Sequence, residues 1–481
     1  MELKFSDLKK VHIVGVCGTL MGAFACFLKR SQISVSGSDQ NIYPPMSEVL
    51  QAAGIELFNG YKKENFDSIK SGLSLAVIGN VIRKDNREAA CIMESNVPYV
   101  SLPEFMEKML LPHTHNIVVS GTHGKTTTSS LMAHVLQQSD KNPSYFIGGV
   151  SQDFPHSFHV SETNKYFVLE GDEYDTAFWD KVPKFNHYLP RDVVLTSVEY
   201  DHADIYPSFE SVIKAFEGLV SRIHPQGRLI ACTDYPVMKR LIEQSSVEVH
   251  TYGSHEVSGA QYTPKNIQTS LNSTSFDIFY KGEKQASVTT PLSGMYNVLN
   301  VLAVWIEARL LGISESQIKS ALASFKGVKR RQEVKLKIDN LILMDDFAHH
   351  PTAVRETLQG LKARFPDHRL VCVFEPRSAT SRRKIFQSEY IEALSNADVI
   401  YVAEPFDQSK TDATERFSAQ EVVEALQAKN KVASRLAPVK EAAMTISNNA
   451  TNHDLIAVLS NGGFDGLLGY LGEELKLRFS K

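Results

Sequence analysis

The chain has 481 residues, of which 43% are hydrophobic and 22% charged, with a formal net charge of −4. At about 100–200 residues per domain, this length predicts two to four globular domains. The balance of acidic and basic residues gives no sign of a nucleic-acid or membrane-surface partner. Local phosphate sites stay compatible with this balance.

Cysteine usage and the N-terminal sequence both bear on the compartment. The five cysteines are scattered and none is spaced as Cys-x-x-Cys, which argues against a disulfide framework or a zinc site. The chain enters an apolar run at 11–14 without the hydrophobic segment of a signal peptide. No apolar run reaches the roughly 18 residues of a membrane span. We therefore expect a cytoplasmic protein.

Short apolar runs alternate with amphipathic stretches, a pattern typical of parallel α/β domains. Three such blocks predict three domains, at 1–111, 112–325 and 326–481. We also predict extra β-structure at 245–290 and a helix at 297–311 that ends at Gly312. The expected strands are 11–16, 33–36 and 75–79 in the first block, 116–119, 166–169 and 193–197 in the second, and 341–344, 370–374, 399–403 and 455–460 in the third.

A glycine pattern follows the first expected strand, with Gly15, Gly18 and Gly22 ahead of a helix that runs to about residue 30. The spacing differs from the Gly-x-Gly-x-x-Gly of dinucleotide binders, so a phosphate-binding turn and a packing role both stay open. Asp39 ends the next strand, where it is either a ligand contact or a cap or turn residue.

The sharpest motif lies between an apolar strand and an amphipathic helix, and reads Gly121-Thr122-His123-Gly124-Lys125-Thr126-Thr127. Its glycines let backbone N–H groups point at phosphate oxygens, and the helix N-terminus adds a positive dipole. Lys125 is expected to bridge the β- and γ-phosphates, and Thr126 to offer its hydroxyl to Mg²⁺. The motif departs from Gly-x-x-x-x-Gly-Lys-[Ser/Thr], because Val119 stands at the first glycine position.

Acidic segments follow the next two expected strands. Glu170 leads into Gly171–Asp175, and Glu199 leads into Tyr200–Asp204 with His202 inside it. Ligands of open α/β sheets bind beyond the carboxyl ends of the strands, where these acids would meet the Mg²⁺ of a nucleotide. Solvated loop charge is the alternative, and His202 alone is more often structural than a ligand.

The third block ends its first strand with Asp345-Asp346-Phe347-Ala348-His349-His350-Pro351. Pro351 fits the first position of a helix, which would make His350 a cap. Adjacent side chains on an extended chain diverge, so contacts to a nucleotide or substrate are favoured over a zinc site. Arg377 and Arg382 follow the next strand and suit carboxylate binding, with surface charge as the alternative for Arg382.

Together these motifs resemble the Mur ligases of peptidoglycan synthesis. The resemblance implies an α/β protein of three domains: an N-terminal Rossmann-like UDP-binding domain, a central P-loop ATPase-like domain and a C-terminal Rossmann-like domain. It also implies an ATP-dependent, ADP-forming ligase that uses Mg²⁺. The matching segments extend nearly end to end and are Gly121–Thr127, Glu170–Asp175, Glu199–His202, 293–300, Gly327–Arg331 and Asp345–Pro351.

The resemblance also implies roles for individual residues. The expected catalytic residues are Lys125, Glu170, His202, Arg331 and Asp346. The expected ATP contacts are Gly121, Thr122, His123, Gly124, Lys125, Thr126, Thr127, Asn297, Arg331, Asp346 and His349. The expected metal ligands are Thr126, Glu170 and His202, and the expected UDP contacts are Gly15, Gly18 and Asp39.

Within the family, the resemblance of three segments favours one reaction: Ser36–Asp39 followed by Tyr43–Ser47, Asp172–Phe178, and Tyr200–Asp204. It joins the peptide L-alanyl-γ-D-glutamyl-meso-diaminopimelate to UDP-N-acetylmuramate during peptidoglycan recycling. L-Alanine is the alternative amine, and a non-catalytic nucleotide sensor is the alternative from another class. An oxidoreductase interpretation of Gly15–Gly22 has the least support. The expected partners are these small molecules, and the oligomeric state stays open.

The sequence departs from the family in two places. Several Mur ligases carry a carbamylated lysine about fifteen residues after the histidine of the second acidic motif, where this chain has Glu217, with Lys214 the nearest lysine. We therefore expect no carbamate. The Asp-Asn-Pro-Arg motif that recognises diaminopimelate in the tripeptide-synthesising ligase is also absent, so the residues that bind the peptide stay unassigned.

Overall fold

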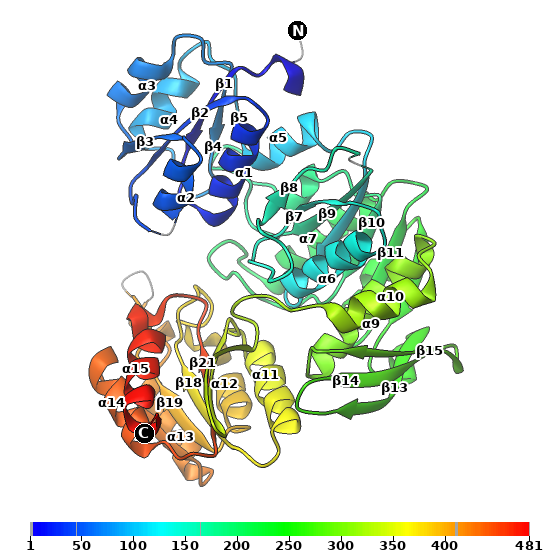
Figure 1. Ribbon diagram of the computed structural model, residues 1–481, viewed down its shortest axis with the longest axis vertical. Helices are drawn as coiled ribbons and strands as arrows, with labels where there is room; N and C mark the ends of the chain where they lie inside the picture. The colour runs from blue at the N-terminus through cyan, green and yellow to red at the C-terminus, as the bar shows by residue number, and fades with distance from the viewer. Residues whose placement is uncertain (1–2, 45, 164, 409–411, 481) are drawn as a thin grey trace. The chain divides into compact units, whose positions relative to one another are not determined.

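Each predicted block of strands and helices folds around its own β-sheet in the computed structural model, which describes residues 3–44, 46–163, 165–408 and 412–480 (Figure 1). The chain forms two compact units. The first takes residues up to Val198, Val212–Thr263 and Val301–Phe325. The second takes Glu199–Ser211, Pro264–Asn300 and the residues from Lys326 onward.

The N-terminal sheet has the strand order β3-β2-β1-β4-β5, with every neighbouring pair parallel. This is the order of one Rossmann half with its next strands, so a ligand crevice is expected where the order reverses beside β1. The strands are β1 (Lys10–Val14), β2 (Ser34–Asp39), β3 (Glu56–Asn59), β4 (Leu75–Ile78) and β5 (Tyr99–Val100). The helices are α1 (Thr19–Arg30), α2 (Met46–Ala52), α3 (Lys63–Ile69), α4 (Arg87–Met93) and α5 (Leu102–Met109).

The central sheet of the first unit runs in the order β12-β11-β10-β6-β9-β7-β8. Its neighbours are parallel except for the edge pair β7 and β8. The strands are β6 (His115–Ser120), β7 (Ser144–Phe146), β8 (Phe158–His159), β9 (Tyr166–Gly171), β10 (Asp192–Leu195), β11 (Arg228–Cys232) and β12 (Glu248–Tyr252). The helices after them are α6 (Lys125–Gln138), α7 (Phe209–Ser221), α8 (Met238–Glu243), α9 (Met295–Leu310) and α10 (Glu315–Ser324).

The predicted β-structure between 245 and 290 is present as β12 and three further strands. These are β13 (Tyr262–Thr269), β14 (Thr274–Tyr280) and β15 (Glu283–Thr290), of which β14 and β15 form an antiparallel hairpin. The predicted helix that follows is α9, and Gly312 beyond its end has a φ of +78°. A positive φ is the expected conformation of a glycine that ends a helix, so this prediction is confirmed.

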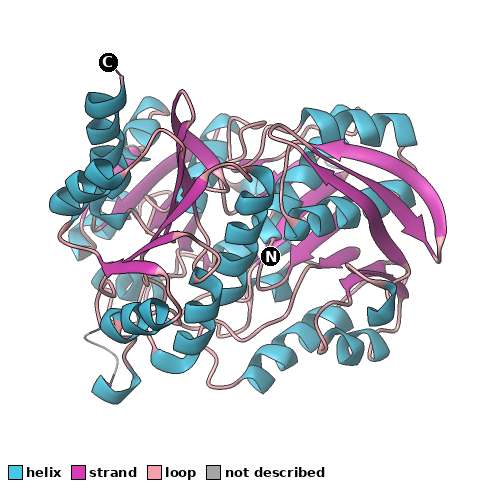
Figure 2. Ribbon diagram, turned by 90° about the horizontal axis from the view of Figure 1, so that it is seen from below, coloured by secondary structure: helices cyan, strands magenta, loops and turns pink. Residues whose placement is uncertain are grey.

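The C-terminal sheet has the order β16-β17-β21-β18-β19-β20, parallel except for the edge strand β16. Cys372 and Phe374 of β18 face one apolar cluster and Val371 and Val373 face the other, so helices cover both faces (Figure 2). The strands are β16 (Glu333–Ile338), β17 (Leu341–Asp346), β18 (Arg369–Phe374), β19 (Val399–Val402), β20 (Val432–Arg435) and β21 (Asp454–Leu459). The helices are α11 (Pro351–Arg364), α12 (Gln387–Leu394), α13 (Ala419–Ala428), α14 (Val439–Asn449) and α15 (Leu467–Phe479).

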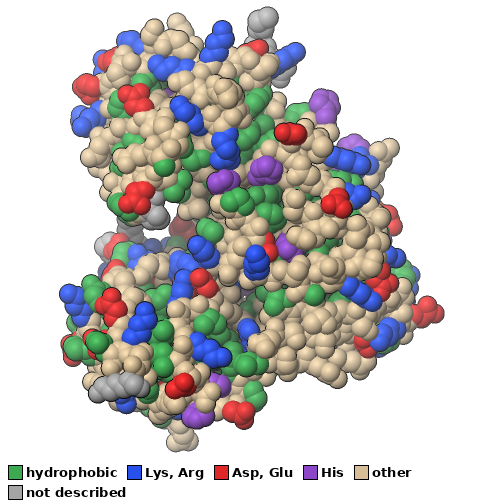
Figure 3. Space-filling view, viewed as in Figure 1, with side chains coloured by type: hydrophobic (Ala, Val, Ile, Leu, Met, Phe, Trp, Pro, Cys, Tyr) green, Lys and Arg blue, Asp and Glu red, His purple; other side chains and the backbone are tan. Residues whose placement is uncertain are grey.

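The distribution of surface charge and the length of the helices bear on the predicted partners. Basic and acidic side chains are interspersed over the face drawn in Figure 3. Within the described ranges, no helix is both long enough and apolar enough to cross a lipid bilayer.

A buried charged cluster lies at the amino ends of β6, β10 and β11. His115 Nε2 lies 2.5 Å from a carboxylate oxygen of Asp192, and Asp192 is the register partner of Arg228. Glu307 of α9 is fully buried near both. Burial raises the pKa of Glu307 well above its usual value, and the Asp192 carboxylate raises it further. Both effects favour the protonated, neutral form of Glu307.

The raised pKa of Glu307 predicts a loss of stability at alkaline pH. The folded chain keeps a proton on Glu307 at pH values where the unfolded chain has lost it, so stability falls as the pH rises above the ordinary glutamate pKa. The substitution Glu307→Gln is neutral at every pH. Between about pH 6 and pH 8.5, we expect thermal unfolding of the wild type to lose more stability than that of Glu307→Gln, by about 1.4 kcal/mol for each pH unit over which one proton stays bound.

The matched control is Glu315→Gln, which changes an exposed glutamate in an ion pair with Lys319. Its stability should follow the wild type across the same pH range. Identical pH slopes for the wild type and Glu307→Gln would contradict a neutral Glu307.

Candidate active site

The phosphate loop joins β6 to α6, and two glycines set its path. Gly121 has a φ of +137° and Gly124 a φ of +81°, conformations that side-chain-bearing residues rarely adopt. The loop is fixed from β10, because the N–H of Thr122 donates to the Ser197 carbonyl at 3.0 Å and that of His123 to Ser197 Oγ at 2.8 Å. The first N–H groups of α6 are therefore available for an anion beyond the carboxyl edge of the sheet.

Lys125, the first residue of α6, is almost buried, with 10% of its side chain exposed. Its ammonium donates to the Gly121 carbonyl at 2.7 Å and to both carboxylate oxygens of Glu173, at 2.9 and 3.2 Å. Burial disfavours the charged form of Lys125, but the Glu173 and Asp172 carboxylates outweigh this and raise its pKa. These carboxylates thus favour the charged ammonium form of Lys125.

Thr126 and Glu170 bring two oxygen donors together beside the loop. Glu170 is the next-to-last residue of β9 and lies directly beside Val119 of β6 in the sheet register. The Thr126 hydroxyl donates to Glu170 Oε1 at 2.6 Å, and the Gly148 N–H donates to Oε2 at 2.6 Å. Burial raises the pKa of Glu170, and the nearby Asp172 carboxylate contributes. A hydroxyl and a carboxylate are hard oxygen ligands of the kind that Mg²⁺ prefers, so this pair fits the predicted metal site.

In the N-terminal sheet, Asp39 at the end of β2 holds the glycine-containing turn that follows β1. Gly15 has a φ of +87°, and Gly18 caps the start of α1. Asp39 accepts hydrogen bonds from the Cys17 N–H at 2.8 Å and from the Tyr61 hydroxyl at 3.4 Å. The structure therefore brings Gly15, Gly18 and Asp39 together, with Asp39 acting as a turn residue.

Gly22 illustrates the packing alternative for the same glycine pattern. A Cβ at Gly22 would meet the Met46 sulfur, which explains this glycine by close packing of α1.

In the second unit, Asp346 ends β17 and organises the segment before β16. Its carboxylate accepts the Gln332 N–H at 2.7 Å and the Ala348 N–H at 2.8 Å. Arg331 lies next to this contact, with its guanidinium 4.8 Å from the centre of the Phe347 ring. Burial raises the pKa of Asp346, although Arg331 opposes that change. The predicted residues Arg331 and Asp346 are thus brought together.

His202 and His349 both lie near one buried carboxylate of the second unit. Each has its Nε2 atom 3.8 Å from Asp201 Oδ2, while the Thr380 hydroxyl donates to Asp201 Oδ1 at 2.6 Å. His202 has a φ of +55°, a conformation that is rare outside glycine. Burial lowers the pKa of His349 to about 4, so His349 is neutral at pH 7.

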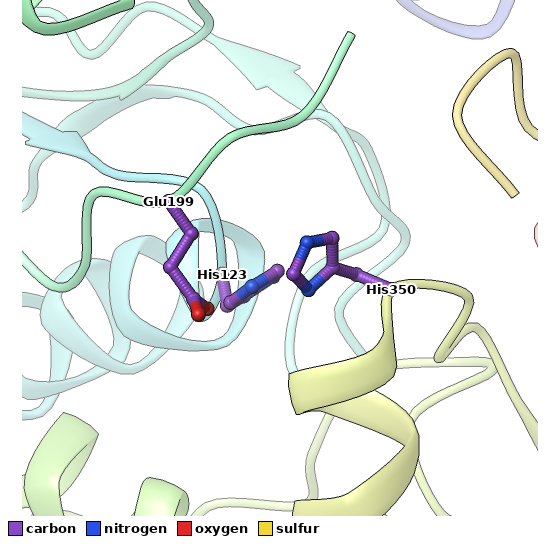
Figure 4. Close-up of side chains that lie close together, drawn as sticks. All are labelled: His123, Glu199 and His350. Atoms are coloured by element: carbon purple, nitrogen blue, oxygen red, sulfur yellow. The ribbon is translucent and has the colours of Figure 1, made fainter. Parts of the chain in front are cut away.

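Figure 4 draws His123 on the phosphate loop, and Glu199 and His350 on the second unit. Within that unit, the Thr352 hydroxyl donates to Glu199 Oε1 at 2.9 Å. His350 accepts the Thr352 N–H at 3.4 Å and Pro351 is the first residue of α11, which confirms the predicted cap. His349 and His350 point to different partners, since His350 Nε2 lies 3.3 Å from the Tyr200 carbonyl oxygen.

Three further predicted contacts are engaged within the second unit. Asn297, in the first turn of α9, donates to the Ser293 carbonyl at 2.8 Å. Arg377 pairs with Glu375 at 3.1 Å and lies 3.6 Å from the centre of the Phe406 ring. Arg382 donates to the Ser378 carbonyl at 3.3 Å.

Comparison with known proteins decides the family. Three family models match in succession: "Mur ligase family, catalytic domain" at residues 10–114, "Mur ligase middle domain" at 119–308 and "Mur ligase, glutamate ligase domain" at 330–462. A ligase of Escherichia coli (strain K12), named UDP-N-acetylmuramate–L-alanyl-γ-D-glutamyl-meso-2,6-diaminoheptandioate ligase, is 34% identical over 95% of this chain and 96% of its own length. The chain belongs to the Mur ligase family.

This Mur ligase is also similar to two other members of the family. A UDP-N-acetylmuramate–L-alanine ligase from Pelodictyon phaeoclathratiforme is also 34% identical, over 84% of this chain and 81% of its own. The crystal structure of a murein peptide ligase from Psychrobacter arcticus 273-4 is 30% identical and superposes with a TM-score of 0.69 over 97% of this chain and 98% of its own. The three-domain α/β architecture expected from the sequence is confirmed.

Within each unit, several residues that hold the predicted residues in place were not assigned a role from the sequence. Ser197 fixes the loop backbone, Thr380 holds Asp201, and Glu173 holds Lys125. Ser197 and Glu173 both follow strands next to or near β6, which is a usable signal for residues at the same sheet edge. Gly148 contributes through its backbone N–H, which no side-chain pattern announces.

Glu217 occupies the position where several Mur ligases carry a modified lysine. Its carboxylate accepts hydrogen bonds from Arg240 Nε at 2.7 Å and from the Gln244 amide at 2.8 Å. An acidic side chain with two donors of its own suits this position without modification.

The conformation of Gly121 predicts that Gly121→Ala disrupts the phosphate loop. A Cβ there would lie 2.7 Å from the Ser197 carbonyl oxygen and 2.8 Å from the Ser197 nitrogen, and would also meet the Thr196 hydroxyl. We expect a loss of about 2 kcal/mol in stability and of at least about tenfold in nucleotide affinity, measured by thermal unfolding and titration calorimetry. Gly469→Ala in α15 is the control, because a Cβ at Gly469 meets nothing within 4 Å. Equal nucleotide affinity of the two variants would contradict the prediction.

Proposed function

We propose that this Mur ligase joins the tripeptide L-alanyl-γ-D-glutamyl-meso-diaminopimelate to UDP-N-acetylmuramate, with ATP converted to ADP and phosphate. The observation that carries the proposal is the extent of the match. The E. coli ligase named for this reaction aligns over 95% of the chain and 96% of its own length. The alanine ligase of similar identity aligns over only 84% and 81%.

The chemistry follows from the poor reactivity of a carboxylate toward amines. An oxygen of the muramate carboxylate attacks the γ-phosphorus, the bond from that phosphorus to the bridging oxygen breaks, and ADP leaves. The neutral amine then attacks the acyl carbon of this acyl phosphate, phosphate departs, and the nitrogen loses a proton. The first step brings a carboxylate to a triphosphate, so it requires cationic groups that lower their repulsion.

The chain's own residues divide this work. The loop Gly121–Thr127 binds the phosphates through Lys125 and the first N–H groups of α6, and Arg331 acts at the γ-phosphate. Thr126, Glu170 and His202 hold Mg²⁺, which supplies charge neutralisation and Lewis acidity at the phosphates. Asn297, Asp346 and His349 contact the nucleotide.

The remaining assignments complete the proposal. Gly15, Gly18 and Asp39 bind the UDP portion of the substrate in a domain that spans 1–111. ATP is bound by a domain at 112–325, and a domain at 326–481 completes the ligase. The enzyme acts in the cytoplasm on small molecules, in peptidoglycan recycling.

An alanine-adding ligase is the second candidate, and the 34% identity of the Pelodictyon enzyme supports it. The two differ only in the amine. We expect phosphate release with UDP-N-acetylmuramate and ATP to be at least about a hundredfold more efficient, as kcat/KM, with the tripeptide than with L-alanine. A preference for L-alanine would replace the proposal by the second candidate. If the chain binds ATP but releases no phosphate with either amine, the result would indicate a nucleotide sensor.

The substitution Lys125→Ala tests the phosphate loop. Loss of the ammonium should lower kcat by at least about a hundredfold, because the phosphate loop then lacks its own cationic group at the phosphates. Circular dichroism and thermal unfolding check that the variant is folded. Lys181→Ala is the control, since Lys181 is 65% exposed and pairs with Asp175 in the same region. Full turnover by Lys125→Ala would remove Lys125 from the mechanism.

A further inference from the structure

The ammonium of Lys125 is held by an anion of the chain itself. Both oxygens of Glu173 lie within hydrogen-bonding distance of Nζ, at 2.9 and 3.2 Å. The two side chains are only 10% and 3% exposed. This ion pair engages the group of the loop that is expected to bind phosphate.

The geometry of the segment after β9 singles out Glu173 for this contact. The neighbouring Asp172 is paired with Lys184 at 3.1 Å. Glu170 accepts the Thr126 hydroxyl and the Gly148 N–H. Each carboxylate of this segment thus has a donor, and Glu173 accepts from the lysine that a triphosphate requires.

A buried lysine needs a counter-charge, because its desolvation costs several kcal/mol unless an anion compensates it. A triphosphate and Glu173 both meet this need, but three donor hydrogens on one ammonium cannot keep the Gly121 carbonyl, two carboxylate oxygens and the phosphates as partners at once. At least one of the two Glu173 oxygens therefore has to give up its hydrogen bond when a phosphate oxygen arrives.

We propose that Glu173 is an exchange partner of Lys125, which holds the ammonium in the nucleotide-free enzyme and releases it to the phosphates of ATP. This inference rests on the proposed role of Lys125 in ATP binding. Competition between the two anions then sets the nucleotide affinity. The pair keeps the loop ordered and its charge balanced between turnovers, and its return favours departure of the products.

A permanent structural ion pair would behave differently. If Glu173 only stabilised the loop, its removal would loosen α6 and weaken nucleotide binding. If Glu173 competes with the nucleotide, its removal strengthens binding. The sign of the change in affinity therefore separates the two roles.

The experiment measures the affinity of the full chain for the Mg²⁺ complex of β,γ-imido-ATP, by titration calorimetry. We expect Glu173→Gln to bind the analogue about fivefold more tightly than the wild type, since a competing charge pair is lost. Asp172→Asn removes a charge of the same sign one residue away without breaking the contact to Lys125, so its gain should be smaller. Unchanged or weaker binding by Glu173→Gln would overturn the proposal.

A double-mutant cycle distinguishes exchange from a general reduction in negative charge. The gain from Glu173→Gln should disappear in a Lys125→Ala background, because no ammonium remains to be shared. An equal gain in both backgrounds would overturn the exchange. Thermal unfolding of each variant checks that the chain is folded.

Steady-state kinetics give a second measure of the exchange. The KM for ATP should fall in Glu173→Gln, while the KM for UDP-N-acetylmuramate stays unchanged. Glu173→Asp, which retains the charge, should restore the KM for ATP toward the wild-type value. A fall in both KM values, or no rescue by Glu173→Asp, would count against the exchange.

These results separate the inference from the proposed function. If Lys125→Ala abolishes phosphate release and Glu173→Gln leaves nucleotide affinity unchanged, the exchange fails and the ligase assignment stands. If Lys125→Ala retains full turnover, the role of Lys125 fails, and the exchange fails with it.

Discussion

A lysine that must stay charged in a nearly dry environment is the constraint on which the central domain depends. Lys125 lies at the start of α6, where the helix dipole already favours an anion and disfavours a cation. Carboxylates that follow the neighbouring strand β9 provide the counter-charge for Lys125. Because β9 runs parallel to β6, the acids that follow it reach the edge at which the phosphate loop begins. The position of β9 beside β6 thus supplies the carboxylates that compensate the charge of Lys125.

A carboxylate near the carboxyl end of a parallel strand is also found in the other two sheets, although the chemistry expected of each sheet differs. Asp39 and Asp346 end parallel strands and Glu170 is the next-to-last residue of one, and each accepts at least one backbone N–H from outside its own strand. A carboxylate in this position orders the loop and places a negative charge at the ligand edge. Such residues are therefore conformational supports as well as candidate ligands, and substitution of any of them disturbs both properties.

The sequence revealed most of the fold because hydrophobic period and turn chemistry are local. The expected strands all exist, with ends shifted by a few residues. Strand 11–16, for example, stops at Val14 because Gly15 turns with a positive φ. The order of the strands, the hairpin of β14 and β15, and the antiparallel edge strand β16 follow from packing between distant segments, which local patterns do not encode.

The site divides in the same way. The phosphate loop and Glu170 could be identified from strand–loop–helix context. Asp201 with Thr380 and Lys125 with Glu173 could not be paired, because these contacts join residues 179 and 48 positions apart in the chain. The spacing of such residues carries no signal until the sheet brings them together.

Glu217 has a consequence for the packing of the helix that carries it. Its carboxylate on α7 accepts hydrogen bonds from Arg240 on α8 and from the Gln244 amide just beyond that helix. One side chain thus links two successive helices of the first unit across 23 positions of the chain.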